Sequence, residues 1–280
     1  MIKLEKVSKR LKTFSLKNLS FELPAGYICG LIGENGSGKT TLIHILAGLY
    51  SLDEGEMNLF GMNYLEYEQM IKNEIGVVLH GDIFERKETL MENANYYGRF
   101  YTNYDAQAMK DYLSRFHLEE KRKYKALSKG EKMKFAFAFA LSHHPKLLLL
   151  DEPNANFDAE FQKEFHDILK EFICDGTRSV LLSTHITSDV ERFADYILFL
   201  KNGRQLLFGD IESVRESYRM VSGEAYKIKL LEDRVIYIEQ GQLTCNALVK
   251  HRNRAYDSKL TVWKPSVTEL MYYMVKGDKR

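Results

Sequence analysis

The side chains best suited to chemistry in this sequence cluster in a glycine-rich segment at 33–40. The segment has the spacing G-x-x-x-x-G-K-[ST] and lies between an apolar run at 27–32 and a helix predicted for 40–49. In that setting glycines let backbone N–H groups curl around a phosphate, Lys39 neutralises its charge, and the Thr40 hydroxyl takes a magnesium position. The predicted nucleotide-binding residues here are Gly33, Glu34, Asn35, Gly36, Ser37, Gly38, Lys39, Thr40 and Thr41.

Two adjacent carboxylates form a second candidate site. Asp151 and Glu152 directly follow the leucine-rich run 146–150, and open α/β sheets bind ligands at the carboxyl ends of such strands. We expect Asp151 to hold hydrated magnesium, which prefers hard oxygen ligands, and Glu152 to orient or deprotonate an attacking water. A solvated acidic turn before Pro153 is the alternative for this pair alone. Its place after the glycine-rich segment favours the site.

A third candidate segment, at 127–131, combines a helix cap with a serine and a glycine. Ser128 and Glu131 form a capping-box pattern before the helical run 132–142, so a helix start is the simplest interpretation. A capped helix N-terminus can also bind an anion, and the two interpretations are compatible. Alternating phenylalanines at 135–139 would also suit a strand, so periodicity alone leaves the element open. The segment consists of Leu127, Ser128, Lys129, Gly130 and Glu131.

Single polar residues complete the set of candidates. His185 ends the β-branched and leucine-rich run that begins at 179, and a lone histidine there is more often structural than catalytic. Asp158 by itself is an unremarkable loop acid. Neither residue would be assigned a function without the surrounding pattern.

Elements that could position these residues follow from the hydrophobic pattern. The runs 75–79, 146–150 and 179–183 are typical of strands in the middle of a covered sheet. Asn202-Gly203 between two apolar runs predicts a hairpin within 196–208. Strands alternating with helices indicate an α/β domain with a largely parallel sheet.

Beyond residue 211 the pattern changes. A helix is predicted at 212–218, followed by alternating segments at 225–231, 234–239 and 259–263. The last helix should begin at Ser266, which forms a capping box with Glu269. We therefore predict a small α+β extension over 212–280, appended to a first domain over 1–211.

Composition excludes several functional classes. Forty Lys and Arg residues balance 39 Asp and Glu residues, so no global field draws the chain to nucleic acid. Cys29, Cys174 and Cys245 lack zinc-ligand or redox-pair spacing and are expected to be reduced thiols of a cytosolic protein. The N-terminus lacks the apolar core of a signal peptide, and no run is long enough to span a membrane.

The segments, taken in order, resemble the ATPases of the ATP-binding-cassette (ABC) family. The likeness covers roughly 1–209 and is closest to bacterial subunits of the type-2 exporter group, which includes exporters of antimicrobial peptides, with 129–145 carrying that similarity. The matching parts are the phosphate loop at 33–40, the LSGGQ signature at 127–131, the acidic strand end at Asp151-Glu152, the D-loop at Asn156-Phe157-Asp158 and the switch histidine at His185.

The resemblance implies an α/β fold of the P-loop NTPase class, of the ABC ATPase type, with an inserted helical subdomain at about 82–144. It implies that ATP and Mg²⁺ are the cofactors and that two ATPase subunits form a head-to-tail dimer, either homomeric or heteromeric. Each ATP would lie between the phosphate loop of one subunit and Ser128 and Gly130 of the other. In the family, Glu152 is the catalytic carboxylate, His185 contacts the γ-phosphate and Asp158 lies in the loop that joins the two sites.

This sequence departs from the family pattern at three places. The Q-loop position after the strand 75–79 is His80, where the family usually has Gln. The signature has Lys129 and Glu131 where the consensus has Gly and Gln. The adenine-stacking aromatic falls between residues 11 and 14, where only Phe14 offers a ring face.

The leading hypothesis is an ATP-hydrolysing subunit of an ABC exporter, peripheral on the cytoplasmic face of a bacterial membrane, with a separate membrane-spanning permease and no nucleic-acid partner. Aromatic residues at 84–101 either form the core of the helical lobe or line a groove that receives the permease. A soluble ABC ATPase acting on ribosomes or DNA would have tandem cassettes, coiled coils or zinc modules, which this sequence lacks. A regulatory module without turnover is disfavoured by Glu152 and His185.

Overall fold

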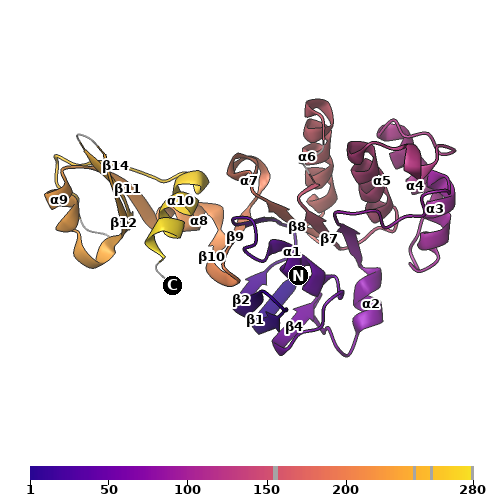
Figure 1. Ribbon diagram of the computed structural model, residues 1–280, viewed down its shortest axis with the longest axis horizontal. Helices are drawn as coiled ribbons and strands as arrows, with labels where there is room; N and C mark the ends of the chain where they lie inside the picture. Colours follow the sequence, from indigo (N-terminus) through magenta and orange to yellow (C-terminus); the bar gives the residue numbers. More distant parts are fainter. Residues whose placement is uncertain (154–156, 242–243, 253–254, 279–280) are drawn as a thin grey trace.

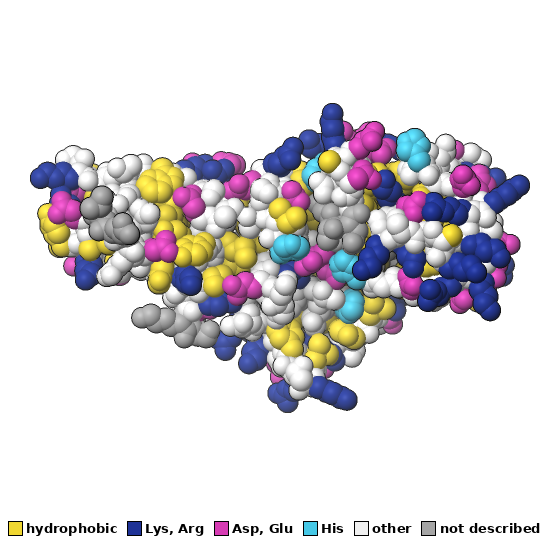
Figure 2. Space-filling view, turned by 45° about the horizontal axis from the view of Figure 1, so that its top comes forward, with side chains coloured by type: hydrophobic (Ala, Val, Ile, Leu, Met, Phe, Trp, Pro, Cys, Tyr) yellow, Lys and Arg dark blue, Asp and Glu magenta, His cyan; other side chains and the backbone are white. Residues whose placement is uncertain are grey.

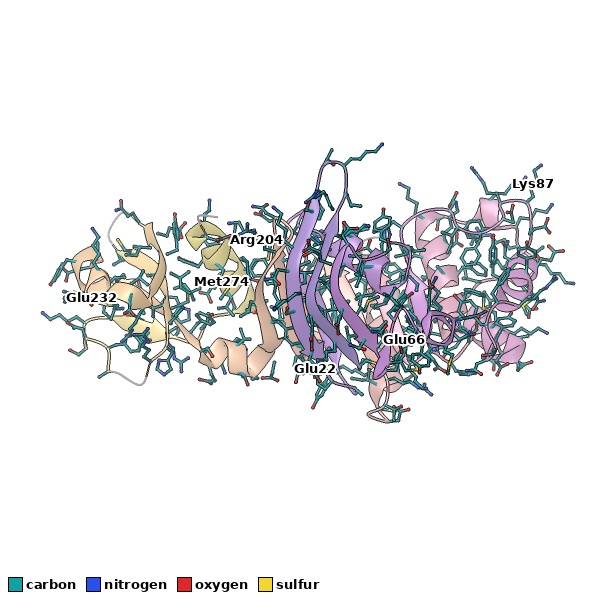
Figure 3. All side chains as sticks on the ribbon, turned by 90° about the horizontal axis from the view of Figure 1, so that it is seen from below. Glu22, Glu66, Lys87, Arg204, Glu232 and Met274 are labelled. Atoms are coloured by element: carbon teal, nitrogen blue, oxygen red, sulfur yellow. The ribbon has the colours of Figure 1, made fainter. Side chains whose placement is uncertain are left out.

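A computed structural model describes residues 1–153, 157–241, 244–252 and 255–278. The molecule is elongated, with a central body of sheets, a helical lobe at one end and a smaller sheet-and-helix unit at the other (Figure 1). From below, the N-terminal strands lie in the middle, between the lobe that carries Lys87 and the C-terminal unit that carries Glu232 (Figure 3).

The central sheet has six strands in the order β10-β9-β3-β8-β7-β6, and all neighbours pair in parallel except the β9-β10 hairpin. Alternate leucines of β7 enter different cores, since Leu148 and Leu150 pack with the lobe helices while Leu147 and Leu149 pack with α1. The largely parallel covered sheet is therefore confirmed. Its strands are β3 (Ile28–Ile32), β6 (Ile75–Val78), β7 (Leu147–Asp151), β8 (Ser179–Thr184), β9 (Tyr196–Lys201) and β10 (Arg204–Asp210).

A second sheet, which the sequence pattern did not single out, is antiparallel and has the order β2-β1-β4-β5. Its buried residues join those of α1 in one core. The helix α1 ends earlier than the predicted position 49, and Gly48 follows with a φ of 71°. These elements are β1 (Ile2–Arg10), β2 (Ser15–Leu23), α1 (Lys39–Leu46), β4 (Glu54–Leu59), β5 (Met62–Asn63) and α2 (Glu68–Asn73).

The helical lobe is built on capped helices. Thr89 and Ser128 each form a capping box, and Asp105 caps α4. The alternating phenylalanines at 135–139 lie in a helix, because Phe135, Phe137 and Phe139 are all buried together with the alanines between them. The helices are α3 (Leu90–Gly98), α4 (Ala106–Arg115) and α5 (Lys129–Leu141), with a 3₁₀ turn, η1 (Tyr124–Ala126), before α5.

Two further helices, α6 (Ala159–Ile173) and α7 (Thr187–Phe193), follow the strands β7 and β8, whose carboxyl ends carry candidate site residues. The helix α6 buries five apolar residues against the lobe core, and α7 begins two residues after His185. The predicted hairpin is present, with Asn202 and Gly203 both at positive φ, 49° and 74°.

The C-terminal unit contains a third sheet, in the order β12-β13-β11-β14, packed against α10. The alternation at 225–231 suggested an extended segment, but this is wrong: α9 forms there, because Ile228 is buried while Tyr226 and Leu230 face solvent. The Ser266 capping box is confirmed. The elements are α8 (Ile211–Glu216), β11 (Tyr218–Gly223), α9 (Ala225–Lys229), η3 (Glu232–Arg234), β12 (Val235–Gln240), β13 (Cys245–Lys250), β14 (Thr261–Trp263) and α10 (Val267–Gly277).

Contacts join this unit to the body. The Lys201 ammonium donates to the carbonyls of Val275 and Asp278 at 2.8 and 2.9 Å. Across the ranges that the structure describes, no helix is both long and apolar enough to cross a membrane.

Candidate functional site

The glycine-rich segment forms the loop between β3 and α1. Gly38 caps α1 at a φ of 111°, and a Cβ atom there would come within 2.6 Å of Leu16 and 2.8 Å of Phe14. Glycine is therefore required by both the backbone angle and the close approach of these side chains. Gly36, at a φ of 78°, has open space around it. At Gly36 the loop thus presents its backbone, with no side chain in the way.

Lys39, only 5% exposed, is held inside this loop. Its ammonium donates to the carbonyls of Gly33 and Glu34 at 2.9 and 3.3 Å. The same nitrogen lies 3.6 Å from a carboxylate oxygen of Glu152. The fixed positive charge is therefore shared between the phosphate loop and the predicted catalytic carboxylate.

Asp151 is 2% exposed and accepts two hydroxyl hydrogen bonds from different elements. The Thr40 hydroxyl donates to Oδ2 at 2.8 Å, and the Ser183 hydroxyl donates to Oδ1 at 2.6 Å. The loop, the end of β7 and the end of β8 are thereby tied together at one carboxylate. Ser183 was not among the residues predicted for the site, and the only sign in the sequence was its place at the end of a buried run.

Glu152 has a φ of 45°, which is uncommon for a residue with a side chain. Its N–H donates to the Ser183 hydroxyl at 2.9 Å, which helps to hold this turn. One carboxylate oxygen faces Lys39, and the other lies 3.3 Å from Nδ1 of the exposed His185. The strained backbone directs the carboxylate between two basic groups, as backbone strain often does at functional sites.

A pocket lies directly over these groups. Phe14 forms part of its wall, half-buried and close to Gly38, so a ring face is available beside the phosphate loop. The residues that line the pocket are Leu11, Phe14, Asn35, Gly36, Gly38, Lys39, Thr40, Thr41 and Glu152. Gly33, Glu34 and Ser37 do not line this space, since Gly33 and Ser37 are buried and Glu34 is exposed elsewhere on the loop.

The donor set suits a magnesium ion bound together with phosphate. Thr40 and Asp151 offer hard oxygen atoms 2.8 Å apart, and Mg²⁺ is usually held by one or two carboxylates plus substrate oxygens. No group of three or more His, Cys, Asp or Glu side chains that could hold an ion by itself occurs within the described ranges. Thr40 and Asp151 are the residues that would hold the ion, and it would supply charge neutralisation at the phosphates.

The signature segment is on the helical lobe, separate from this pocket. Ser128 caps α5, and its hydroxyl accepts from the Glu131 N–H at 3.2 Å while the Glu131 carboxylate accepts from the Ser128 N–H at 2.7 Å. Leu127 is buried below the cap, and Lys129 and Gly130 form its first turn. Among the described residues that line the pocket over the phosphate loop, none comes from this segment.

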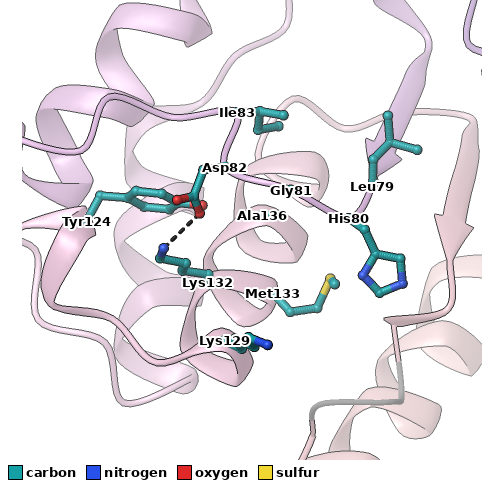
Figure 4. Close-up of a pocket in the computed structure, with 10 residues that line it drawn as sticks. All are labelled: Leu79, His80, Gly81, Asp82, Ile83, Tyr124, Lys129, Lys132, Met133 and Ala136. Carbon is teal, nitrogen blue, oxygen red and sulfur yellow. Dashed lines mark hydrogen bonds and ion pairs between the residues drawn. The ribbon is translucent and has the colours of Figure 1, made fainter.

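His80 is exposed at the carboxyl end of β6, where the chain leaves the sheet for the lobe. A second pocket opens beside it, between residues 79–83 and the start of α5 (Figure 4). On the far side of this pocket the Lys132 ammonium bonds the Asp82 carboxylate at 2.7 Å. The predicted Q-loop position and the signature helix therefore border the same hollow.

Asp158 caps α6, and its carboxylate accepts from the Phe161 N–H at 2.8 Å. The other carboxylate oxygen lies 3.3 Å from the Lys134 ammonium of α5. Asn156, the first residue of the predicted D-loop, lies outside the described residues.

Comparisons with known proteins place this geometry in a family. The family described as "ABC transporter" matches residues 16–155. The ATP-binding protein YtrB of Bacillus subtilis is 25% identical over 95% of this chain and 92% of its own length. Nod factor export ATP-binding protein I of Burkholderia lata is 32% identical over 72% and 68%, and the molybdenum import protein ModC of Vibrio cholerae is 28% identical over 94% and 79%.

A solved structure adds the assembled state of a similar protein. The dimeric post-hydrolysis state of the ATP-binding cassette MJ0796, bound to ADP and Pi, is 25% identical and has a TM-score of 0.67. The likeness covers 75% of this chain and 99% of that one. The fold and the type of site are therefore shared with a protein that binds the products of ATP hydrolysis.

Proposed function

The chain belongs to the ABC transporter family of ATP-binding proteins and is an ATPase, and we propose that it powers export through a separate membrane-spanning partner. The observation that carries the ATP-hydrolysing part of the proposal is the convergence of Lys39, Asp151 and Glu152 at the carboxyl ends of β3 and β7. Open α/β sheets bind ligands at such ends.

Each residue has a task in hydrolysis. Lys39 and the loop N–H groups would bind the β- and γ-phosphates, and Phe14 would stack on the adenine. Glu152 would accept a proton from the attacking water, because its side chain lines the pocket over the phosphate loop. His185 would contact the γ-phosphate, and Mg²⁺ on Thr40 and Asp151 would neutralise the charge that develops.

We further propose that two subunits complete each ATP site head to tail. Ser128 and Gly130 begin a capped helix, and such helix starts favour phosphate groups. They do not line the pocket of their own chain, so a second subunit would bring them to it. The dimeric state of the similar cassette supports this arrangement.

A groove beside the lobe is the proposed contact with the membrane partner. It runs between α2, β6, α3 and α5, and its walls are mostly apolar, including Leu49, Ile83 and Tyr97. Phe84 is buried in the lobe core, whereas Phe100 and Tyr96 are exposed at 71% and 52%. The stretch 84–101 thus contributes both to the core and to an exposed apolar surface of the kind that binds proteins.

The direction of transport rests on similarity. The relatives include both an export protein and an import protein, so they do not decide the direction. Export is supported by the resemblance of 129–145 to exporters. Binding to a permease would hold the subunit on the inner face of the cell membrane. Charged residues of both signs are interspersed on the face shown in Figure 2, which supports a protein partner rather than nucleic acid.

The proposal is tested by paired surface variants. Phe100→Glu places a charge in the groove, and Leu230→Glu is the matched control because Leu230 is exposed to the same degree, 72%, in the C-terminal unit. We expect Phe100→Glu to lose co-purification with the membrane partner while ATP turnover of the isolated subunit stays unchanged. Equal recovery of the partner with both variants would reject the groove as its binding site.

A further inference from the structure

A carboxylate at the signature is a feature that needs a compensating charge. Glu131 stands three residues after Ser128, in the first turn of the helix that we assign to the partner's ATP. A triphosphate brought to this helix would meet a second anion, and like charges at short range repel. Binding there requires that the charge of Glu131 be neutralised.

Arg122 supplies that neutralisation. Its guanidinium forms a two-pronged ion pair with Glu131, in which Nη1 bonds Oε1 and Nη2 lies 3.2 Å from Oε2. The same Nη2 donates to the carbonyl of Ala126 at 2.9 Å. A planar fork fixes a carboxylate in orientation as well as in charge, so the whole loop from 122 to 131 is closed by one side chain.

Two other basic side chains of the same helix are engaged elsewhere. Lys132 pairs with Asp82, and Lys134 pairs with Asp158. Within the described part of the chain, Lys129 has no ion-pair partner among the acidic side chains. Arg122 is thus the cation whose geometry is matched to Glu131.

The ion pair also keeps Glu131 in place as a cap. Partial burial by itself raises the pKa of Glu131, but hydrogen bonds from the Ser128 N–H and from Arg122 outweigh it and leave that pKa below its ordinary value. The carboxylate therefore stays ionised, and it holds the Ser128 backbone at 2.7 Å. The position of the Ser128 hydroxyl depends on this arrangement.

We propose that Arg122 is a positioning residue for ATP-driven dimerisation: it neutralises Glu131 and holds the Ser128 end of α5 ready for the partner's ATP. The proposal deepens the proposed function and rests on it. A purely structural ion pair of this exposure would contribute little to stability and nothing specific to dimerisation.

The test uses Arg122→Ala, Glu131→Gln and the double variant, each in the turnover-deficient Glu152→Gln background. Lys121→Ala is the matched control, because it removes one exposed positive charge from the adjacent position. The measurements are the ATP concentration for half-maximal dimerisation, the ATP affinity of the monomer and the melting temperature.

We expect Arg122→Ala to raise the ATP concentration for dimerisation about tenfold, because an unpaired carboxylate then faces the triphosphate. ATP affinity of the monomer should be unchanged. Glu131→Gln should restore dimerisation of Arg122→Ala to within about threefold of the starting protein, because it removes the repelling charge and keeps a capping amide. Lys121→Ala should stay within about twofold.

Two results would overturn the proposal: normal dimerisation of Arg122→Ala, or a double variant as impaired as Arg122→Ala alone. A variant that fails through misfolding is recognised by its melting temperature, and Arg122→Lys, which keeps the charge without the fork, then takes its place with an intermediate shift expected. Ser128→Arg distinguishes failure of the Arg122 proposal from failure of the head-to-tail model. If Ser128→Arg also dimerises normally, the head-to-tail model itself is wrong.

Discussion

The two halves of the proposed ATP site are held by different physical means. The phosphate-loop half rests on the ends of β3, β7 and β8, strands whose residues are all buried. In this half, buried Asp151 accepts a hydrogen bond from Thr40, and buried Lys39 donates one to the Gly33 carbonyl. The signature half lies on the helical lobe and is held by ion pairs that are open to water in part, such as Arg122 with Glu131.

This difference assigns separate duties to the halves. A site fixed by buried strands keeps its geometry, as the chemistry of phosphoryl transfer requires. Ion pairs at partly exposed positions are weaker and are screened by salt, so the arrangement of the signature should depend on ionic strength more than that of the phosphate loop. Changes to the first half should therefore abolish binding or turnover, whereas changes to the second should alter dimerisation and coupling.

The largest effect is expected from Glu152→Gln. The substitution removes the carboxylate that accepts the proton from water and leaves Lys39 and the loop in place. ATP binding should persist while steady turnover falls by at least about tenfold. Turnover above about a tenth of the starting value would show that another group is the base.

Lys39→Ala should act on binding itself. Loss of the buried ammonium removes the main positive charge opposite the phosphates, so the affinity for ATP should fall by about tenfold or more. Direct titration of the purified subunit with ATP measures this. An affinity equal to that of the unchanged protein would contradict the assignment of the loop.

Substitutions of His80, which lies between the two halves, should have smaller effects on ATPase activity. An imidazole is a poor magnesium ligand, so His80→Gln should lower the Mg²⁺ concentration for half-maximal ATPase activity by about threefold. His80→Ala should reduce partner-stimulated activity more than basal activity. Magnesium titrations with and without the membrane partner measure both effects. Unchanged profiles for both variants would show that His80 takes no part in magnesium binding or coupling.

The smallest expected effect is a loss of stability at acidic pH that comes from a buried histidine of the helical lobe. Burial lowers the pKa of His143, which lies at the end of α5, stacks on Tyr101 and contacts the carbonyls of Phe139 and Ile75. The folded state therefore favours neutral imidazole. As pH falls below the unfolded value of 6.5, the unfolded chain binds the proton more readily and the free energy of unfolding decreases.

His143→Gln should remove part of that decrease between pH 7 and 5. Denaturant titrations at several pH values measure the slope for both proteins. The rest of the slope should include His166 of α6, whose pKa burial also lowers, and His166→Gln is the companion variant. An identical slope for all three proteins would exclude buried histidines as the acid-sensitive groups.

Much of the site was predictable because it depends on local order along the chain. The glycine-rich loop, Asp151-Glu152 and the Ser128–Glu131 cap are short motifs whose setting, strand or helix, follows from adjacent residues. The structure brings Lys39, Thr40, Asp151, Glu152 and His185 together, as the parallel sheet requires.

The remaining features depend on contacts between distant segments. Ser183 and Arg122 gain their importance from contacts with Asp151 and Glu131, and no spacing rule identifies such partners. The segment 225–231 was misjudged because alternation over a few residues fits either a strand or one buried helix face, and the third sheet determined which formed. The structure gives the positions of the site residues, and their roles in binding and hydrolysis, including those of Phe14 and His80, stay predictions.

Composite sites shared between two subunits can be tested most directly by measuring particle mass in solution with MgATP for Glu152→Gln and for Glu152→Gln combined with Ser128→Arg. We predict that the first variant is a dimer with ATP and a monomer without it. The second should bind ATP with equal affinity but stay a monomer, because without the Ser128 hydroxyl its signature can no longer receive the partner's phosphate. ATP-dependent dimers of the double variant, or a fully ATP-loaded first variant that remains monomeric, would contradict the shared site.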